Sequence, residues 1–230
     1  CWAIYKKGTY GDFLGRGVDD LKEALFLIDE LHKVGVDYIK IINSGIFMPK
    51  SGKISRGGFD KKELKEMVSY AKHRNLEVYC HANGDERIGD AVEAGVSCII
   101  HGFYISEDTL RLMHEKHVCF IPTVYALLSL SEMGDKNIVK DMVERHLSAI
   151  KRSSEIGVTI KAGSDAGSFI PYGSSYISEL ELLKKAGLTY EEVLHTAISK
   201  PFRQGESADF LLLDGFKVKK IFLRNREVPI

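Results

Sequence analysis

The chain has 230 residues, enough to bury a substantial core within one domain of ordinary to large size. Lys plus Arg equals Asp plus Glu, at 32 each, so no net charge favours nucleic acid, an anionic membrane or an acidic substrate. No apolar run approaches the roughly 20 residues that span a bilayer, and the first residues show no signal-peptide pattern. We therefore expect a cytoplasmic protein with a small-molecule substrate and with neither nucleic acid nor membrane as a partner.

Short apolar runs alternate with amphipathic helical patterns along most of the chain. Asp60 with Glu63, and Thr189 with Glu192, have the spacing of capping boxes that open helices. Strand-like runs occupy 2–5, 38–42, 78–81, 98–101, 118–122 and 159–162, and helical patterns begin near 19, 60, 86, 106, 138, 178 and 189. The tail differs, because 210–213 and 218–223 predict two short strands with no helix between them.

This alternation predicts a parallel sheet whose strands, apolar along their length, are buried on both faces. About six strand–helix units fit most of a (β/α)8 barrel, the TIM-barrel class of α/β fold. A doubly wound open sheet has the same alternation, although the lack of GxGxxG after an early strand argues against a Rossmann fold. We assign the barrel to residues 1–205 and the strand-rich tail to 206–230.

The cysteines within this pattern are Cys80, Cys98 and Cys119, which lie in apolar strand-like runs, and Cys1 at the start. No two of them form a CxxC pair. Zinc thiolates and disulfides remain alternatives, but the apolar setting favours buried, reduced core residues.

Four polar residues stand out because they lie within or just after predicted strands: Lys40, His81, His101 and Asp165. In a parallel barrel the carboxyl ends of the strands open onto one face, so we expect these side chains to meet there. An unpaired ammonium at Lys40 would cost several kcal/mol in a buried strand. A salt-bridged lysine is one alternative; a Lys40 carbamate, formed with carbon dioxide, would instead offer anionic oxygens to a metal.

The two histidines favour zinc, because neutral imidazoles are common zinc ligands, although hydrogen-bonded core histidines are the alternative. Asp165 could cap the turn that follows it, or accept a proton from a metal-activated water and pass it to a leaving amine. His146, on a long helix, is a weaker candidate for substrate contact. We expect no catalytic role for the remaining histidines, His32, His73, His114, His117 and His195.

The ordered set of Lys40, His81-Ala82-Asn83-Gly84, Ile100-His101-Gly102 and Gly163-Ser164-Asp165-Ala166-Gly167 resembles the amidohydrolase superfamily. The resemblance runs from about Asp12 to Leu213 and is strongest with the imidazolonepropionase-related and prolidase-like branch. It implies a metal-dependent hydrolase barrel with one or two divalent ions, usually Zn²⁺.

By this resemblance Lys40 is the carboxylated bridging lysine, His81 and His101 are ligands of the second metal, and Asp165 is a ligand and proton shuttle. Tyr125 falls where the branch often has a substrate-facing residue. The tail strands resemble part of the small β-sandwich that follows the barrel in the family.

The chain departs from the family pattern in one decisive respect: it contains no His-x-His, the pair that binds the first metal. The connection 198–205 is also shorter than usual. We expect an incomplete barrel of strands 3–8, which needs a second copy or a complementing chain. Other metals, such as manganese, iron or cobalt, suit the same ligands.

The expected function is metal-dependent hydrolysis of an amide or related C–N bond in a small molecule, such as a cyclic amide or a dipeptide-like compound. The alternative is a noncatalytic barrel fragment that binds metal, ligand or a partner chain. A phosphate-binding barrel that uses Gly163-Ser164 is a third reading, but it leaves Lys40, His81 and His101 unexplained.

Overall fold

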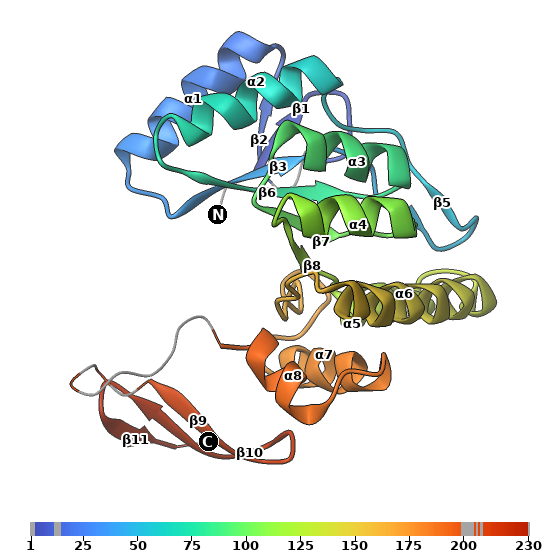
Figure 1. Cartoon of the computed structure of the whole chain (residues 1–230), viewed down its shortest axis with the longest axis vertical. Coiled ribbons are helices and arrows are strands. Elements are labelled where there is room, and N and C mark those ends of the chain that lie inside the picture. Colours follow the sequence, from blue (N-terminus) through green and yellow to red (C-terminus); the bar gives the residue numbers. More distant parts are fainter. Residues whose placement is uncertain (1–2, 12–14, 199–204, 206, 208, 230) are drawn as a thin grey trace.

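A six-stranded parallel sheet has the strand order β2-β1-β3-β6-β7-β8 and lies in the upper half of the view in Figure 1. The computed structural model describes residues 3–11, 15–198, 205, 207 and 209–229. The strands of the sheet are β1 (Ala3–Lys6), β2 (Gly15–Val18), β3 (Tyr38–Ile42), β6 (Glu77–Ala82), β7 (Cys98–His101) and β8 (Cys119–Ile121). Every neighbouring pair in it is parallel, which agrees with part of a barrel.

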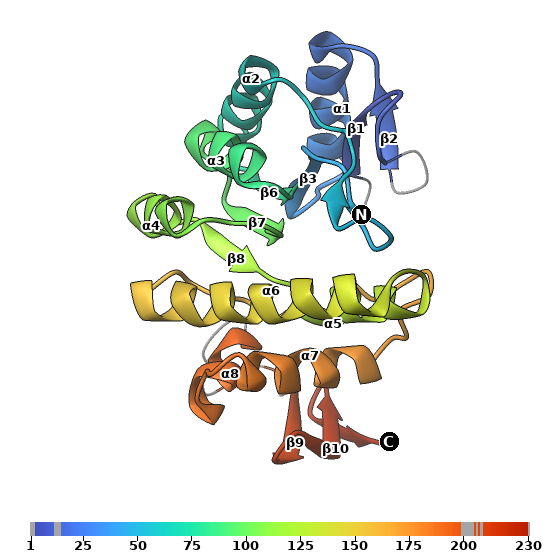
Figure 2. The same ribbon diagram turned by 90° about the vertical axis from the view of Figure 1, so that its right-hand side faces the viewer.

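Helices connect the strands and cover the sheet. The first four follow one another over the same side of the sheet: α1 (Leu21–Lys33), α2 (Lys61–Lys72), α3 (Asp85–Ala94) and α4 (Glu107–Glu115) (Figure 1). Beyond β8 come α5 (Val124–Ser129), a 3-10 turn (Leu130–Glu132), α6 (Lys136–Ile156), α7 (Ser174–Lys185) and α8 (Tyr190–Thr196), with α6 between β8 and α7 (Figure 2). Both predicted capping boxes, at Asp60 and Thr189, are present.

The two faces of the sheet have different roles, because successive strand side chains alternate. On β3, Ile39 and Ile41 are fully buried in the main core, together with helix residues such as Leu64 and Met67. The alternate positions of the same strand, including Lys40, point to the opposite face. That face holds a small second cluster of Ala3, Tyr5 and Ile42.

The predicted strand at 159–162 is reduced to a single parallel bridge between Phe120 and Ile160. Several elements were not predicted: β2, a hairpin of β4 (Phe47–Met48) and β5 (Lys53–Ile54) within the Gly-rich connection after β3, the short helix α5 with the 3-10 turn after it, and the last strand, β11 (Arg226–Val228). Each is too short for a periodic pattern, and β2 contains two glycines, which weaken strand propensity.

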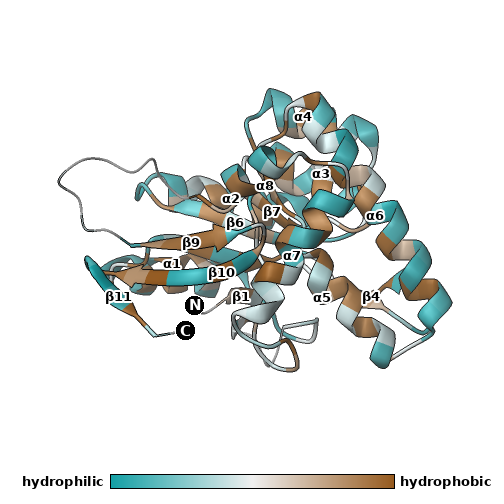
Figure 3. Cartoon of the chain, turned by 90° about the horizontal axis from the view of Figure 1, so that it is seen from below, coloured by the Kyte–Doolittle hydropathy of each residue, from teal (hydrophilic) through white to brown (hydrophobic). Residues whose placement is uncertain are grey.

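The tail forms a three-stranded antiparallel sheet of β9 (Phe210–Asp214), β10 (Lys217–Leu223) and β11 (Arg226–Val228). The apolar residues of β9 are partly exposed, and the strand is largely apolar in Figure 3. The Tyr190 hydroxyl donates to the carbonyl of Gly215 at 2.6 Å, which ties the β9–β10 turn to α8. Residue 206 of the predicted boundary at 205/206, and 199–204 of the connection before it, lie outside the described residues, as do Trp2 and Asp12.

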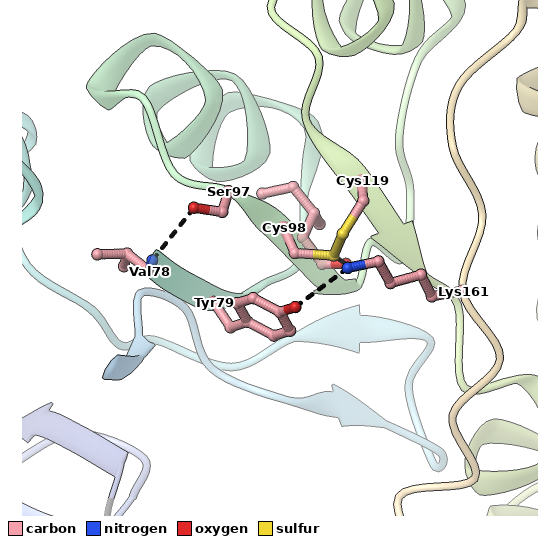
Figure 4. Close-up of a disulfide and its surroundings, with 7 residues drawn as sticks. Val78, Tyr79, Ser97, Cys98, Cys119 and Lys161 are labelled. Atoms are coloured by element: carbon pink, nitrogen blue, oxygen red, sulfur yellow. Dashed lines mark hydrogen bonds between the residues drawn. A yellow bond between two sulfur atoms is a disulfide. The ribbon is translucent and has the colours of Figure 1, made fainter. Parts of the chain in front are cut away.

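Cys98 and Cys119 form a disulfide between β7 and β8, with 4.4 Å between their Cα atoms (Figure 4). The prediction that this pair is reduced is wrong. The register pairs Cys98 directly with Cys119, and the sequence alone does not show register. Cys80 is free and buried, as predicted. Because disulfides are rare in the cytosol, the pair gives the expected cytoplasmic location no support.

Within the described part of the chain, no helix combines the length and the apolar character that crossing a bilayer requires.

Candidate metal centre

Lys40 and His81 lie on the same face of the sheet, at its carboxyl-terminal end. The register pairs Lys40 with Tyr79 and Ile42 with His81, and parallel strands point paired residues to the same side. Lys40 and His81 are therefore diagonal neighbours on the face opposite the helices. His81 is buried, and Lys40 is partly exposed.

His101 joins this pair from the end of β7. Its register partner is Ala82, so simple alternation would turn its side chain toward the helices. The backbone of His101 is instead left-handed, with φ of 71°, and its ring meets that of His81 edge-on at a centroid distance of 4.5 Å. The two imidazoles therefore come together at the ends of neighbouring strands.

One nitrogen of the His81 ring is held by the loop after β3. Its Nε2 lies 3.0 Å from the carbonyl oxygen of Gly45, and Asn83 Nδ2 donates to the same oxygen at 3.2 Å. A side chain at Gly45 would collide with Ser55, so only glycine brings this carbonyl to the ring. With the proton on Nε2, Nδ1 of His81 would keep a lone pair for a metal.

One nitrogen of His101 is held in the same way from the end of β8. Its Nδ1 lies 2.7 Å from the hydroxyl oxygen of Thr123. If Nδ1 donates this bond, Nε2 is the nitrogen that would bind a metal. Each imidazole thus has one nitrogen fixed by the protein, an arrangement that metal-binding histidines share with hydrogen-bonded core histidines.

Burial and charge both favour neutral imidazoles at this site. Burial, then the neighbouring His101 ring and Lys40, lower the pKa of His81 well below its usual value. The pKa of His101 is also lowered well below its usual value, first by burial and then by the charges of Lys40 and His146. Both rings therefore present unprotonated nitrogen at neutral pH, the form that binds metals.

Asp165 lies near this pair but is exposed on the loop after the Phe120–Ile160 bridge. Its negative charge raises the pKa of His81, as the weakest of several influences. It is also the second cause, after burial, that raises the pKa of Tyr10 to about 12. The ring of Tyr10 lies 5.6 Å from that of His81, so Tyr10 is a neighbour of the imidazole pair that also feels the charge of Asp165.

Left-handed backbone conformations gather among these residues. His101, Thr123 and Asp165 have φ values of 71°, 51° and 53°, and none of them is glycine. Such conformations cost on the order of 1–3 kcal/mol each and are concentrated at functional sites. For Thr123, a β-branched residue, the conformation is especially uncommon.

The donor set fits a metal through its two neutral imidazoles. Among the described residues, no three His, Cys, Asp or Glu side chains are grouped closely enough to bind an ion. Lys40 as an ammonium would repel a cation, whereas its carbamate would add anionic oxygens. The fit of the site therefore depends on the chemical state of Lys40.

Tyr125 and His146 lie on the two helices that follow β8, α5 and α6. Tyr125 is partly exposed on α5. His146 is 1% exposed on α6, its Nε2 lies 2.9 Å from the Pro122 carbonyl, and its ring packs edge-on against Phe103 and Phe120. Burial lowers the pKa of His146 to about 4. In this conformation its side chain supports the loop and has no open surface toward a substrate.

A polar cavity of about 410 Å³ lies at the other end of the sheet. It is lined by residues at the amino-terminal ends of the strands, including Glu77, Ser97, His117 and Thr159, and by Cys119 of the disulfide. Lys161 donates to the Tyr79 hydroxyl there at 3.2 Å (Figure 4). Since active sites of such barrels form at the carboxyl-terminal ends, this cavity is separate from the candidate metal centre.

Sequence reasoning missed three residues of this region: Tyr10, Thr123 and Glu179. Tyr10 and Thr123 come from irregular segments and have no pattern that marks them. Glu179 did have a signal, because it lies beside Leu180 and one turn before Leu183 on the apolar stripe of α7, where a carboxylate is unusual. Its side chain is fully buried.

Comparison with known proteins identifies the family of the chain. The sequence model of the amidohydrolase family matches residues 13–217. The ochratoxinase of Aspergillus niger is 26% identical over 217 residues, which cover 90% of this chain and 44% of that protein. The chain thus spans less than half the length of this curated relative.

Solved structures share the fold over nearly the whole chain. The crystal structure of A. niger ochratoxinase aligns with a TM-score of 0.83 at 20% identity, covering 98% of this chain and 64% of that one. A prolidase complexed with N-methylphosphonate-L-proline gives 0.82 at 21%, covering 99% and 67%. A Xaa-Pro dipeptidase with bound methionine gives 0.70 at 25%, covering 85% and 53%.

The family match covers most of the chain and includes all four candidate residues, so this protein belongs to the amidohydrolase family.

Proposed function

We propose that this chain carries metal-binding residues of a hydrolase that cleaves an amide or related C–N bond in a small molecule. The observation that carries the proposal is the pair of neutral, buried imidazoles of His81 and His101, 4.5 Å apart at neighbouring strand ends. Dipeptidase and prolidase structures are among those the chain resembles, which supports a dipeptide-like substrate; a cyclic amide is the other substrate class that we propose.

A divalent ion, for which we propose zinc, would be held by His81 Nδ1, His101 Nε2 and the carbamate of Lys40. When bound, such an ion supplies Lewis-acid polarisation of a carbonyl and acidifies a water. The carbamate forms when the neutral amine of Lys40 attacks carbon dioxide and loses a proton, so a cation is replaced by an anion. This change would also relieve the unfavourable charge that Lys40 places beside both imidazoles.

Asp165 would accept the proton of the attacking water and deliver it to the departing nitrogen. Its exposed position on a loop leaves it accessible to both groups.

Tyr10 and Tyr125 would border the substrate. We propose that a second copy or a complementing chain completes the barrel of strands 3–8 and the small β-sandwich. His146 would affect substrate binding indirectly, because it holds the segment at Pro122 that leads into α5.

The second candidate is a noncatalytic barrel fragment that binds metal, ligand or a partner chain. Two observations favour it: the sequence has no His-x-His, and the described residues contain no group of three His, Cys, Asp or Glu side chains that could hold an ion. Hydrolysis by the purified chain is the property that separates the two candidates.

The experiment is an assay of the purified chain against Xaa-Pro dipeptides, N-acyl amino acids and cyclic amides, after zinc loading and after chelation. We expect zinc-dependent hydrolysis and a loss of about 100-fold or more in Asp165→Asn, which removes the proton acceptor. Bound zinc without turnover of any compound would favour the noncatalytic fragment. Unchanged turnover in Asp165→Asn would remove Asp165 from proton transfer.

A further inference from the structure

Glu179 is a fully buried carboxylate that reaches from α7 to the start of α5. Its Oε1 accepts the backbone N–H of Val124 at 3.0 Å, and its Oε2 accepts that of Tyr125 at 2.7 Å. The side chain is 0% exposed. Both carboxylate oxygens are therefore used to hold two successive amides of one short helix.

This carboxylate is held without a nearby cation. Burial raises its pKa to about 7, and only the two backbone N–H groups act in the opposite direction. None of the ion pairs found among the described residues includes Glu179. A buried charge with no counter-charge is costly, so packing alone does not account for it.

The two amides that Glu179 holds directly follow Thr123. Thr123 is 1% exposed and has the left-handed φ of 51°, which turns the chain from β8 into α5. Its hydroxyl lies 2.7 Å from Nδ1 of His101. A displacement of the amides after Thr123 would therefore move the group that orients the His101 ring.

We propose that Glu179 is a positioning residue of the metal centre: it clamps the first amides of α5 so that the Thr123 hydroxyl holds His101 with Nε2 facing the metal. This inference rests on the proposed function, since it assigns His101 as a ligand. Glu179 acts from α7 through the backbone of α5 and the side chain of Thr123, and its own side chain is fully buried.

A neutral amide at position 179 would not accept hydrogen bonds from both backbone N–H groups. Glutamine has nearly the shape of glutamate but only one oxygen, so its amide N–H would face a backbone N–H where Glu179 accepts. One of the two bonds is lost and a repulsive contact replaces it. The variant Glu179→Gln thus tests the clamp with little change in packing volume.

The test compares Glu179→Gln with Glu181→Gln, a matched change at an exposed position of the same helix. On the metal-free chain, hydrogen exchange of the Val124 and Tyr125 amides and the NMR signals of the His101 ring are recorded. Zinc titration then gives the affinity. We expect exchange at least about 10-fold faster, a shifted His101 signal and roughly 10-fold weaker zinc binding in Glu179→Gln only.

If zinc affinity and the His101 signal in Glu179→Gln match those of the parent, the positioning role is overturned, even if the two amides exchange faster. If the parent chain binds no zinc, the proposed function fails, and the imidazole signal still decides whether Glu179 positions His101. Should Glu179→Gln fail to fold, Thr123→Val replaces it. That variant keeps the branched shape but removes the hydroxyl next to His101 Nδ1, and it must shift the His101 signal and weaken zinc binding for the inference to stand.

Discussion

The rings of His81 and His101 meet edge-on at 4.5 Å, although His101 pairs in register with Ala82 and not with His81. The left-handed backbone at His101 makes this contact possible, because it turns the side chain out of the strand's alternation. Thr123 and Gly45 then hold one nitrogen of each ring. The contact brings together two candidate ligands that lie 20 positions apart in sequence.

The imidazole pair predicts a direct effect on metal binding. His81→Asn and His101→Asn should each weaken zinc affinity by at least about 100-fold, because each removes one of two neutral nitrogen ligands. Isothermal titration with zinc would measure this loss. His32→Asn, at an exposed position near the end of α1, is the control and should bind zinc like the parent. Equal affinity in all three variants would rule out the imidazole pair as a metal site.

A carbamate at Lys40 predicts a chemical signature that an ammonium lacks. After incubation with ¹³C-bicarbonate and zinc, the parent chain should show a protein-bound carbamate carbonyl signal in its ¹³C NMR spectrum. Lys40→Met keeps an unbranched side chain that is one atom shorter and has no amine, so it should lose both the signal and most zinc affinity. A parent spectrum without the signal, in a chain that binds zinc, would show that Lys40 is not a carbamate ligand.

Glu179 predicts a pH dependence of stability. Burial raises its pKa from the ordinary 4.5 to about 7, so between these values the folded chain binds the proton more tightly than the unfolded chain. The contribution of Glu179 to the free energy of unfolding is fully present below pH 4.5. It is lost as the pH rises toward 7, by on the order of 3 kcal/mol. Tyr176, whose own pKa is raised by burial and then by Glu179, titrates well above this window.

Urea unfolding between pH 4.5 and 8 would measure how the free energy of unfolding changes with pH. The free energy of unfolding of the parent minus that of Glu179→Gln cancels the other titrating groups. It should fall by on the order of 3 kcal/mol as pH rises from 4.5 to 7, because only the parent loses stability in this window. Parallel curves for the two proteins would mean that Glu179 is not protonated with a raised pKa in the folded state.

The disulfide predicts sensitivity to reductant. It closes a loop with a sequence separation of 21, so the chain-entropy argument gives a contribution of roughly 3 kcal/mol to the free energy of unfolding. Reduction should lower stability of the parent by about this amount. The double variant Cys98→Ser/Cys119→Ser should be equally destabilised and should not respond to reductant, whereas Cys80→Ser should respond like the parent. A parent that is unaffected by reductant would contradict a bridge between β7 and β8.

The sequence alone indicated the alternation of strands and helices, both capping boxes and the four residues at strand ends. These features depend on local periodicity and on residue type, which the sequence records directly. The family resemblance was likewise visible in Lys40, His81, His101 and Asp165, and the match over residues 13–217 confirms it.

Only the tertiary structure decided which of these residues touch, and what holds them. Register set Cys98 opposite Cys119, against the prediction of free thiols, and reduced the strand at 159–162 to one bridge. Left-handed turns at His101 and Thr123 redirected side chains that alternation would have placed elsewhere. The buried contact of Glu179 joins positions 55 residues apart. Such contacts depend on how distant segments pack, and no local pattern in the chain records that.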